Sequence, residues 1–476
     1  MIDQNIDIGT DTDLLKSLLN VWVQKKHRNN VRSVYYDGEA ALKDFGISLP
    51  PQMQNIRAAL GWVTKGVHAV TDRSQFEGFV STSGSSDPLG LAQIASDNRF
   101  DVEFPAATVS SAVHGCSFIT VTQGDPQSGE PEILMLPRAA DMSAAIWDDR
   151  KRSLRGFLSI VETDENNMHE PSYMVLYTPE RVYQLEKLNG RWVTDYRTHK
   201  LGRVPAAPLT YGYELRRPLG HSRITRAAMH YSDSALRTIV RAEVSAEFYS
   251  APEYYLFGAD VQDFIGNDKW TAIMGRIKAK DVEDGDDKPT VQRFEGSSPQ
   301  PHTDQLLMWA QLFGDDQDLD VKFADSSKPT SAESIFAAKE TLITTTDRAN
   351  RTWGYGAVDA ARMAVQLRDG AISEESRGLS AQFTDPAIVS PGARADSFVK
   401  LASAIDGFGA SEVGLEYAGL SREQITRFQA EQRRMQVSSL ISSLGQNATS
   451  AKQDPQVEEL SGQRGSSGTD GPITGV

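Results

Sequence analysis

Two helix-forming segments that enclose a short, strand-rich insert constrain the fold of this chain more than any other feature. In the first segment, which follows Pro218 and Gly220, apolar and mostly small residues recur three, four and seven positions apart. The members of this stripe are Ile224, Ala227, Ala228, Tyr231, Ala235, Ile239, Ala242 and Ala246. That spacing predicts an amphipathic helix. Because small side chains let neighbouring helices approach closely, we expect close helix packing along the stripe.

The opposite side of the same helix is basic, with Arg223, Arg226, Arg237 and Arg241. A solvated face is the simplest interpretation of these arginines. Pro252 is expected to end the helix, because proline disfavours helical geometry in the residue before it.

Strand-like runs follow at residues 254–257, 270–277 and 290–294, so the insert is predicted to be small and turn-rich. An acidic turn at residues 281–287 lies within it. This turn lacks the spacing of an EF-hand, which favours a solvated turn and leaves a calcium site open as the alternative.

A cluster of carboxylates separates the insert from the second long helix. The cluster comprises Asp315, Asp316, Asp318 and Asp320. Mutual repulsion between these side chains favours an extended, solvated loop over residues 314–329. The second helix is predicted to begin after Pro329, because Thr330 and Glu333 have the spacing of a capping box.

The rest of the chain predicts an α+β fold with several domains, since 476 residues are too many for one core. Helical stripes begin near Asp11 and after Pro51. Strand-like runs separated by turns occupy residues 118–121, 133–136, 158–161, 173–177 and 182–185. Further helices are predicted at residues 395–405, 411–418 and 421–443. From Gln446 onward apolar groups are few, so residues 446–476 are expected to be disordered.

Sequence patterns for catalysis are sparse. The chain has no G-x-x-x-x-G-K-[ST] phosphate loop, no H-E-x-x-H pattern and a single cysteine, so ATP hydrolysis and zinc chemistry have no visible apparatus. Cys116 lies two residues after His114, so one interpretation is a nucleophilic cysteine with a histidine as its base. The favoured interpretation is that Cys116 is a small buried residue at the start of a strand. No cofactor and no metal ion is expected.

Several short patterns occur in a fixed order along most of the chain. They are Tyr35-Tyr36-Asp37-Gly38, the run from Ala112 to Phe118, Trp147-Asp148, Gly202-Arg203-Val204-Pro205, Gly220-His221-Ser222-Arg223-Ile224, the run from Ser245 to Pro252, and the run from Thr330 to Ile335. Each is short, but their order resembles the portal proteins of tailed bacteriophages, in the branch related to the portal of phage SPP1.

The resemblance implies a phage portal fold with wing, stem, clip, tunnel loop and helical crown, assembled as a ring of about twelve copies around an axial channel. It divides the chain into a wing at residues 1–213 and 370–394, a stem helix at 214–250, a clip at 251–301, a second stem helix at 302–313, a tunnel loop at 314–329, a long channel or wing helix at 330–368, a helical crown at 395–445 and a disordered tail at 446–476.

The resemblance also implies roles for individual residues. The tunnel loop that lines the DNA channel would contain Asp315, Asp316, Asp318, Asp320, Lys322 and Lys328. Subunits would pack side by side through Ala228, Ala235, Ala242 and Ala246. The clip would dock the large terminase and then the head–tail adaptor through Tyr254, Tyr255, Phe257, Trp270, Arg276 and Phe294.

As a portal, the protein would sit at one capsid vertex of the virion, contact the major capsid and scaffolding proteins, and pass double-stranded DNA without sequence specificity. A formal charge of −15 disfavours a general nucleic-acid binder, but acidic walls suit a conduit because they repel the DNA backbone. The acidic N-terminus has no signal-peptide pattern, and no stretch approaches the ~18 apolar residues of a membrane span. We therefore expect assembly in the host bacterial cytoplasm.

Two other classes of protein stay open. One is another virion assembly protein, such as a capsid or tail component. The other, less favoured, is a hydrolase that uses Cys116, which a loss of activity in a folded Cys116→Ala variant would support. A ring with an open axial channel in electron micrographs would separate a portal from both.

Overall fold

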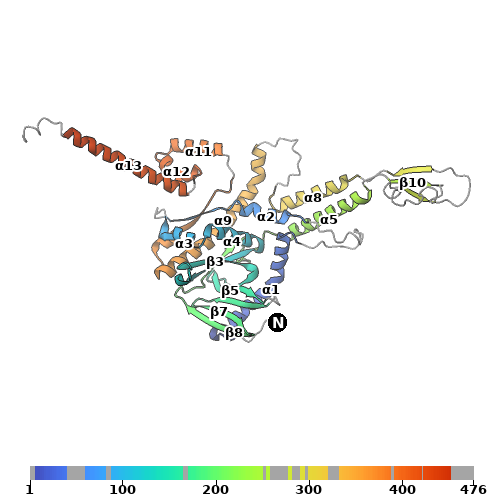
Figure 1. The fold of residues 1–476 in the computed structure, drawn as a ribbon, viewed down its shortest axis with the longest axis horizontal. Helices are drawn as coiled ribbons and strands as arrows, with labels where there is room; N and C mark the ends of the chain where they lie inside the picture. Colours follow the sequence, from blue (N-terminus) through green and yellow to red (C-terminus); the bar gives the residue numbers. More distant parts are fainter. Residues whose placement is uncertain are drawn as a thin grey trace, which may run out of the picture. The chain divides into compact units, whose positions relative to one another are not determined.

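The computed structural model describes residues 6–39, 59–81, 87–164, 170–249, 253–257, 277–280, 290–294, 298–319, 332–387, 391–420 and 422–451. The chain divides into two compact units, Met1–Pro386 and Ala387–Val476 (Figure 1). Helices and sheets are mixed along the first unit, so the predicted α+β class is confirmed. Within the described ranges, no helix has both the length and the apolar character needed to cross a membrane.

A three-stranded antiparallel sheet lies at the centre of the first unit. Its middle strand, β2 (Cys116–Gln123), pairs with β3 (Ile133–Ala139) and β9 (Ala206–Thr210). On one face of β2, Ile119 and Val121 belong to the largest hydrophobic core, and on the other face Phe118 packs toward the second sheet. Burial on both faces explains why this strand has a nearly continuous apolar sequence.

The second sheet is an antiparallel meander of five strands. These are β4 (Ser143–Asp148), β5 (Ser153–Thr163), β6 (Pro171–Tyr177), β7 (Arg181–Leu188) and β8 (Arg191–Thr198). Helix α1 (Thr12–Tyr36) covers its outer face with Leu15, Leu18 and Trp22. Strands β7 and β8 are joined by a two-residue turn at Asn189 and Gly190. Both residues have positive φ, as a type I′ hairpin turn requires.

Two helices pack against the three-stranded sheet, α4 (Phe100–His114) and the long α9 (Ala332–Asp369). Small residues let α9 approach closely, because a Cβ at Gly356 would lie 2.4 Å from the carbonyl oxygen of Pro208. The indole of Trp353, fully buried on α9, donates to the hydroxyl of Ser111 on α4 (3.0 Å). The two helices are therefore joined by a buried hydrogen bond as well as by apolar packing.

The remaining elements of the first unit are α2 (Trp62–Thr71), β1 (Phe76–Ser81), α3 (Leu91–Asp97), α5 (Arg226–Tyr249), β10 (Glu253–Phe257), β11 (Ile277–Lys280), β12 (Thr290–Phe294), α8 (Gln300–Asp316), α10 (Glu374–Arg377) and β13 (Leu379–Phe383). Helices α5 and α8 pack against each other. In the insert between them, β10 pairs with parallel β11 and antiparallel β12. Strands β1 and β13 form a separate two-stranded sheet.

The second unit is helical, with α11 (Pro391–Ala404), α12 (Glu412–Tyr417) and α13 (Arg422–Ala451). Aromatic contacts join its first two helices, since the ring of Phe408 lies 6.3 Å from that of Phe398 and 6.1 Å from that of Tyr417. The hydroxyl of Ser411 caps α12 by accepting a hydrogen bond from the backbone of Gly414 (3.0 Å).

The structure departs from the sequence-based expectations at several places. Helix α4, which contains Pro105 after its first turn, was not predicted, and neither were β1, β4, β8, β9 and β13. Helix α13 extends to Ala451, so residues 446–451 are helical and not disordered as expected. Residue 421, where the last helix was predicted to begin, and the tail from residue 452 lie outside the described residues.

Candidate functional site

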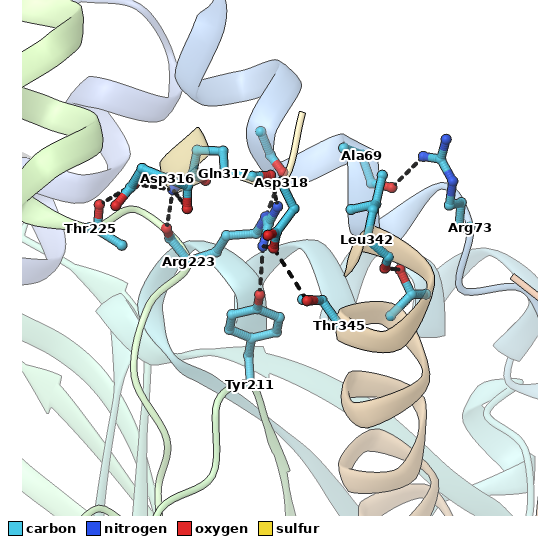
Figure 2. A network of polar contacts seen from close by, with 12 residues as sticks. Ala69, Arg73, Tyr211, Arg223, Thr225, Asp316, Gln317, Asp318, Leu342 and Thr345 are labelled. Carbon is cyan, nitrogen blue, oxygen red and sulfur yellow. Dashed lines mark hydrogen bonds and ion pairs between the residues drawn. The ribbon is translucent and has the colours of Figure 1, made fainter. Parts of the chain in front are cut away.

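One buried side chain, Arg223, joins the segment before α5 to the end of α8 (Figure 2). Arg223 is only 5% exposed. Its Nε donates to the carbonyl of Gly66 (2.7 Å), its Nη1 donates to the hydroxyl of Tyr211 (3.0 Å), and its Nη2 donates to the carbonyl of Gln317. The planar guanidinium thus uses donors in three directions, which a lysine could not reproduce.

Gln317, which is 2% exposed, forms the second part of this arrangement. Its Nε2 donates to the carbonyl of Arg223 (3.2 Å) and to Oδ2 of Asp316 (2.7 Å). The hydroxyl of Thr225 donates to the same carboxylate oxygen (2.6 Å). The bond from Gln317 to Arg223 and the charge-assisted bond from Thr225 to Asp316 join the end of α8 to the segment just before α5.

Asp318 extends the contacts to α9. Its Oδ2 accepts a hydrogen bond from the hydroxyl of Thr345 (3.2 Å) and lies 3.9 Å from Nη1 of Arg223. The Asp318 side chain is 23% exposed, so salt screens this ion pair less than a surface pair. We call these contacts the Arg223 junction, which comprises Gly66, Tyr211, Arg223, Thr225, Asp316, Gln317, Asp318 and Thr345.

The junction corrects the expectation of an extended, solvated loop from Gly314. Helix α8 continues through Asp316, and both Gly314 and Gln317 are buried. Repulsion between the carboxylates does not open this segment, because Arg223 and hydroxyl donors satisfy Asp316 and Asp318. Asp315 is exposed, as expected. The predicted loop residues Asp320, Lys322 and Lys328 lie outside the described residues.

The basic face predicted on α5 is also only partly solvated. Arg226 is exposed, Arg237 and Arg241 are half-buried, and Arg223 lies inside the junction before the helix begins. Arg223 was therefore wrongly grouped with solvated arginines. The pattern Gly220-His221-Ser222-Arg223-Ile224 contained a signal for its role, because Gly220 has positive φ and its backbone lies against Gly115 and Tyr211, which leaves no room for a side chain.

The small-residue stripe on α5 is divided between two environments. Ala228 (1% exposed) and Ala235 (0% exposed) are buried within this single chain, Ala228 in its largest core. Ala242 is half-buried and Ala246 is exposed. The expectation of contacts between subunits is thus wrong for Ala228 and Ala235, whose close packing occurs inside the subunit, and it stays a prediction for the other two.

The residues assigned to the clip are partly described. Tyr254, Tyr255 and Phe257 lie on β10, where Tyr254 pairs with Ile277 of β11 and with Arg293 of β12. Phe294 ends β12 opposite Glu253. The structure thus brings β10 and the end of β12 together in one small sheet. Trp270, Arg276 and the acidic turn 281–287 lie outside the described residues.

The chemistry of Cys116 and His114 does not favour a nucleophile with its base. Burial raises the pKa of the Cys116 thiol to about 12, so the thiol is protonated near neutral pH, whereas the thiolate is the nucleophile. Burial lowers the pKa of His114. His114 ends α4 and Cys116 begins β2, so the two do not share one strand. In the described part of the chain, no three His, Cys, Asp or Glu side chains gather as a metal site would need.

Comparisons with known proteins bear on the remaining classes. No protein-family model matches the chain. Two portal proteins, from Mycobacterium phage D29 and Mycobacterium phage L5, are each 27% identical to it over 447 and 441 residues. These alignments cover 90% and 89% of this chain and 89% and 88% of the relatives. The chain is thus similar to phage portal proteins along most of its length.

Among solved structures, a chain of the "Neck of native GTA particle computed with C12 symmetry" matches this chain with a TM-score of 0.40 and 12% sequence identity. The match covers 74% of this chain and 86% of that one.

Proposed function

We propose that the chain is the portal subunit of a tailed bacteriophage, which forms a ring-shaped channel at one capsid vertex for packaging and ejection of double-stranded DNA. The similarity to two phage portal proteins along nine-tenths of both partners carries this proposal. Because the similarity spans nearly the whole length, it is not a likeness of one shared domain. The protein is accordingly a component of the virion.

Several finer assignments belong to the same proposal. Helices α5 and α8 would form the stem, the insert with β10, β11 and β12 the clip, and α11, α12 and α13 the crown. The segment after Asp318 would form the tunnel loop, with Asp315 at its base. Large terminase would dock at the clip during packaging and supply the ATPase chemistry, and a head–tail adaptor would replace it. Capsid and scaffolding proteins would surround the ring, which assembles in the host cytoplasm from about twelve copies.

An acidic chain suits this role. A channel that repels phosphates lets DNA slide, whereas a basic surface would hold it through counterion release. The formal charge of −15 agrees with guidance of DNA and disfavours gripping it.

Electron microscopy of the purified protein tests the proposal directly. We expect negative-stain images to show closed rings with an open axial channel, and light scattering to give a mass of about twelve subunits. A protein that stays monomeric at micromolar concentrations, or that forms closed shells or tubes, would contradict the portal role and favour another assembly protein. Hydrolytic activity that disappears in a folded Cys116→Ala variant would favour the enzyme alternative.

A further inference from the structure

Helix α13 packs on its own unit near its start. Ile425 is 1% exposed, and α13 contacts α12. Beyond Gln429, every side chain of α13 that the structure describes, at residues 430–439 and 441, is exposed. The large apolar side chains that α13 exposes are Phe428 (37%), Met435 (67%), Val437 (55%) and Ile441 (65%). Because helices in proteins gain most of their stability from packing of an apolar face, these side chains indicate a contact with another surface.

The exposed apolar residues fall on two opposite sides of α13. A helix turns by about 100° per residue, so Phe428 and Met435, which are seven residues apart, differ in direction by only about 20°. Val437 and Ile441 are four residues apart and differ by about 40°. Val437 lies about 180° from Phe428, so the second pair points to the opposite side of the helix. A single partner along one face would not cover both pairs.

One of these sides is acidic. Glu431 lies three residues after Phe428 and four before Met435, so it shares their side, and it is exposed. The arginines in this part of the helix each lie about 100° or more from Phe428. From residue 428 to 435, Glu431 is therefore the one charged residue on this side. We call Phe428, Glu431 and Met435 the Phe428 side.

The opposite side is basic and hollowed. A hollow of about 400 Å³ is lined by Arg433, Arg434, Val437, Ser438 and Ile441. Residues 433–441 include no Asp or Glu, so the charged residues of this lining are both arginines. An apolar hollow beside guanidinium groups suits an aromatic ring, because a guanidinium can lie against the face of the ring. We call this lining the Val437 side.

We propose that the Phe428 side of α13 in one copy of the chain packs against the Val437 side of α13 in the next copy. Glu431 would then meet Arg433 and Arg434, and the ring of Phe428 would enter the hollow. Because the two sides point in opposite directions, one contact cannot use both, as a two-fold dimer would need. A closed ring gives each copy a neighbour on both sides. The inference rests on the proposed portal ring and assigns the contact surface of its crown.

The positions of the two sides along α13 determine how neighbouring copies are oriented. The apolar residues of the Phe428 side are centred near residue 431 and those of the Val437 side near residue 439, roughly 12 Å apart at 1.5 Å per residue. Copies related by a ring axis lie at the same level, so the two sides can meet only if α13 is inclined to that axis. Helices parallel to the axis in an electron-microscopy reconstruction of the rings would contradict the proposal.

Reversal of charge tests the contact. Glu431→Arg places like charges in it, and so does the double variant Arg433→Glu with Arg434→Glu. For each protein alone, we expect the concentration at which half of the subunits are in rings, measured by light scattering, to rise about tenfold. An equimolar mixture of the two should restore the original midpoint, because opposite charges then meet in an alternating ring. Pairing within one helix would not be restored by mixing.

The matched control is Gln436→Arg. Residue 436 is exposed and lies about a quarter turn from both the Phe428 side and the Val437 side, so an added arginine there faces neither neighbour. This variant should form rings like the unchanged protein. Because all of these positions are exposed, the thermal unfolding of the subunit should be the same in every variant.

Hydrogen exchange reports on α13 itself, even where other contacts hold the ring together. The amides of residues 430–441 should exchange slowly in rings of the unchanged protein and in rings of the mixture. They should exchange rapidly in the Glu431→Arg protein, and also in the unchanged protein diluted below ring formation. The reason is that these residues have no packing partner within the described part of one chain.

The outcomes separate this inference from the proposed function. If the unchanged protein forms no rings, the proposed function fails and the inference fails with it. If it forms rings, and Glu431→Arg changes neither their midpoint nor the exchange of α13, only the contact is wrongly assigned. A mixture that does not restore rings would also overturn it. Slow exchange that persists in ring-free protein would show that the same chain covers α13, and slow exchange found only in assembled particles would assign the two sides to another virion protein.

Discussion

Arg223 shows how one side chain can determine the local structure of distant segments. It contacts backbone or side-chain oxygens of Gly66, Tyr211, Gln317 and Asp318 while remaining 5% exposed. A buried charge of this kind is tolerated only when it is fully paired. The same contacts explain why the carboxylates after α8 do not simply repel one another into solvent.

Replacement of Arg223 should therefore be severe. Arg223→Met leaves the carbonyls of Gly66 and Gln317 without their donor and the Asp318 carboxylate without its ion-pair partner, and we expect the free energy of unfolding to fall by about 3–5 kcal/mol. Arg226→Met, which removes an exposed arginine three residues later, should change it by no more than about 0.5 kcal/mol. Urea denaturation of both variants provides the measurement. A similar loss in both would show that the Arg223 junction contributes no more than a surface residue.

His114 should make stability depend on pH. Burial lowers its pKa below the ordinary value of 6.5, with Arg32 nearby, whose guanidinium donates to the His114 carbonyl (2.7 Å). As the pH falls below 6.5, the unfolded chain binds a proton that the folded chain does not bind, so stability decreases. Urea midpoints at pH 7 and pH 5 should therefore differ less in His114→Gln than in the unchanged protein. An equal difference in both proteins would assign the acid sensitivity to other groups.

At the scale of elements, helix α5 has different neighbours along its length. Near its start, Ala228 and Ala235 are buried by the same chain, whereas Ala242 and Ala246 are progressively more exposed. A stripe of small residues therefore indicates close packing, but it does not show whether the packing partner is the same chain or another subunit. The part of α5 available for contacts between subunits is its second half.

Tryptophan substitutions along α5 separate the two environments. Ala235→Trp overfills a site with no free space, and we expect it to lower the free energy of unfolding of the subunit by about 1–3 kcal/mol. Ala246→Trp, at an exposed position, should leave subunit stability unchanged. Calorimetry at concentrations below ring formation measures both. If Ala235→Trp were as stable as the unchanged protein, Ala235 would not be buried as described.

At the scale of the whole molecule, the carboxylates of the acidic cluster that can affect the charge of the channel are those that the Arg223 junction does not bind. Asp316 and Asp318 are structural, so replacing all four carboxylates would perturb folding and channel charge together. Asp315 is exposed and can be changed alone. Any test of the channel must therefore separate Asp315 from its neighbours.

Asp315→Lys should leave rings intact and slow DNA packaging, because about twelve new positive charges would bind phosphates at the base of the loop. The length of packaged DNA per particle, compared at low and moderate salt, measures the effect. The deficit should shrink as salt rises. Asp315→Asn, which removes charge without reversing it, is the control and should package more DNA than the lysine variant. Full-length packaging by Asp315→Lys at low salt would place Asp315 away from the DNA.

Removal of the C-terminal tail should not affect assembly. Helix α13 reaches Ala451, so the truncation belongs after that residue and not within the helix. Residues 452–476 are rich in Gly, Ser and Gln and contain too few apolar groups to offset the entropy of ordering. Ring yield measured by size exclusion should be the same with and without the tail. Loss of soluble rings on truncation would show that the tail takes part in assembly.

Local sequence patterns determined much of the architecture. Apolar periodicity placed α1, α5, α8 and α9, and alternating runs placed β2, β3, β5, β6 and β7, because these elements bury one regular face or a continuous apolar run. The order of short patterns resembled a portal protein, and the full-length similarity supports that family. Helix α4 was missed because Pro105 lies inside it and because small or polar residues such as Thr108 and Ser111 form part of its buried face, which hides the apolar period.

Only the tertiary structure decided which polar residues are buried and what they bind. Arg223 and Gln317 resemble surface residues in sequence, because a charged or amide side chain is exposed unless distant segments bring partners to it. The partners of Arg223 come from Gly66, Tyr211 and Gln317, far apart along the chain. Apolar periodicity in the sequence indicates which face of a helix or strand is buried. Pairing between distant segments leaves no such local pattern.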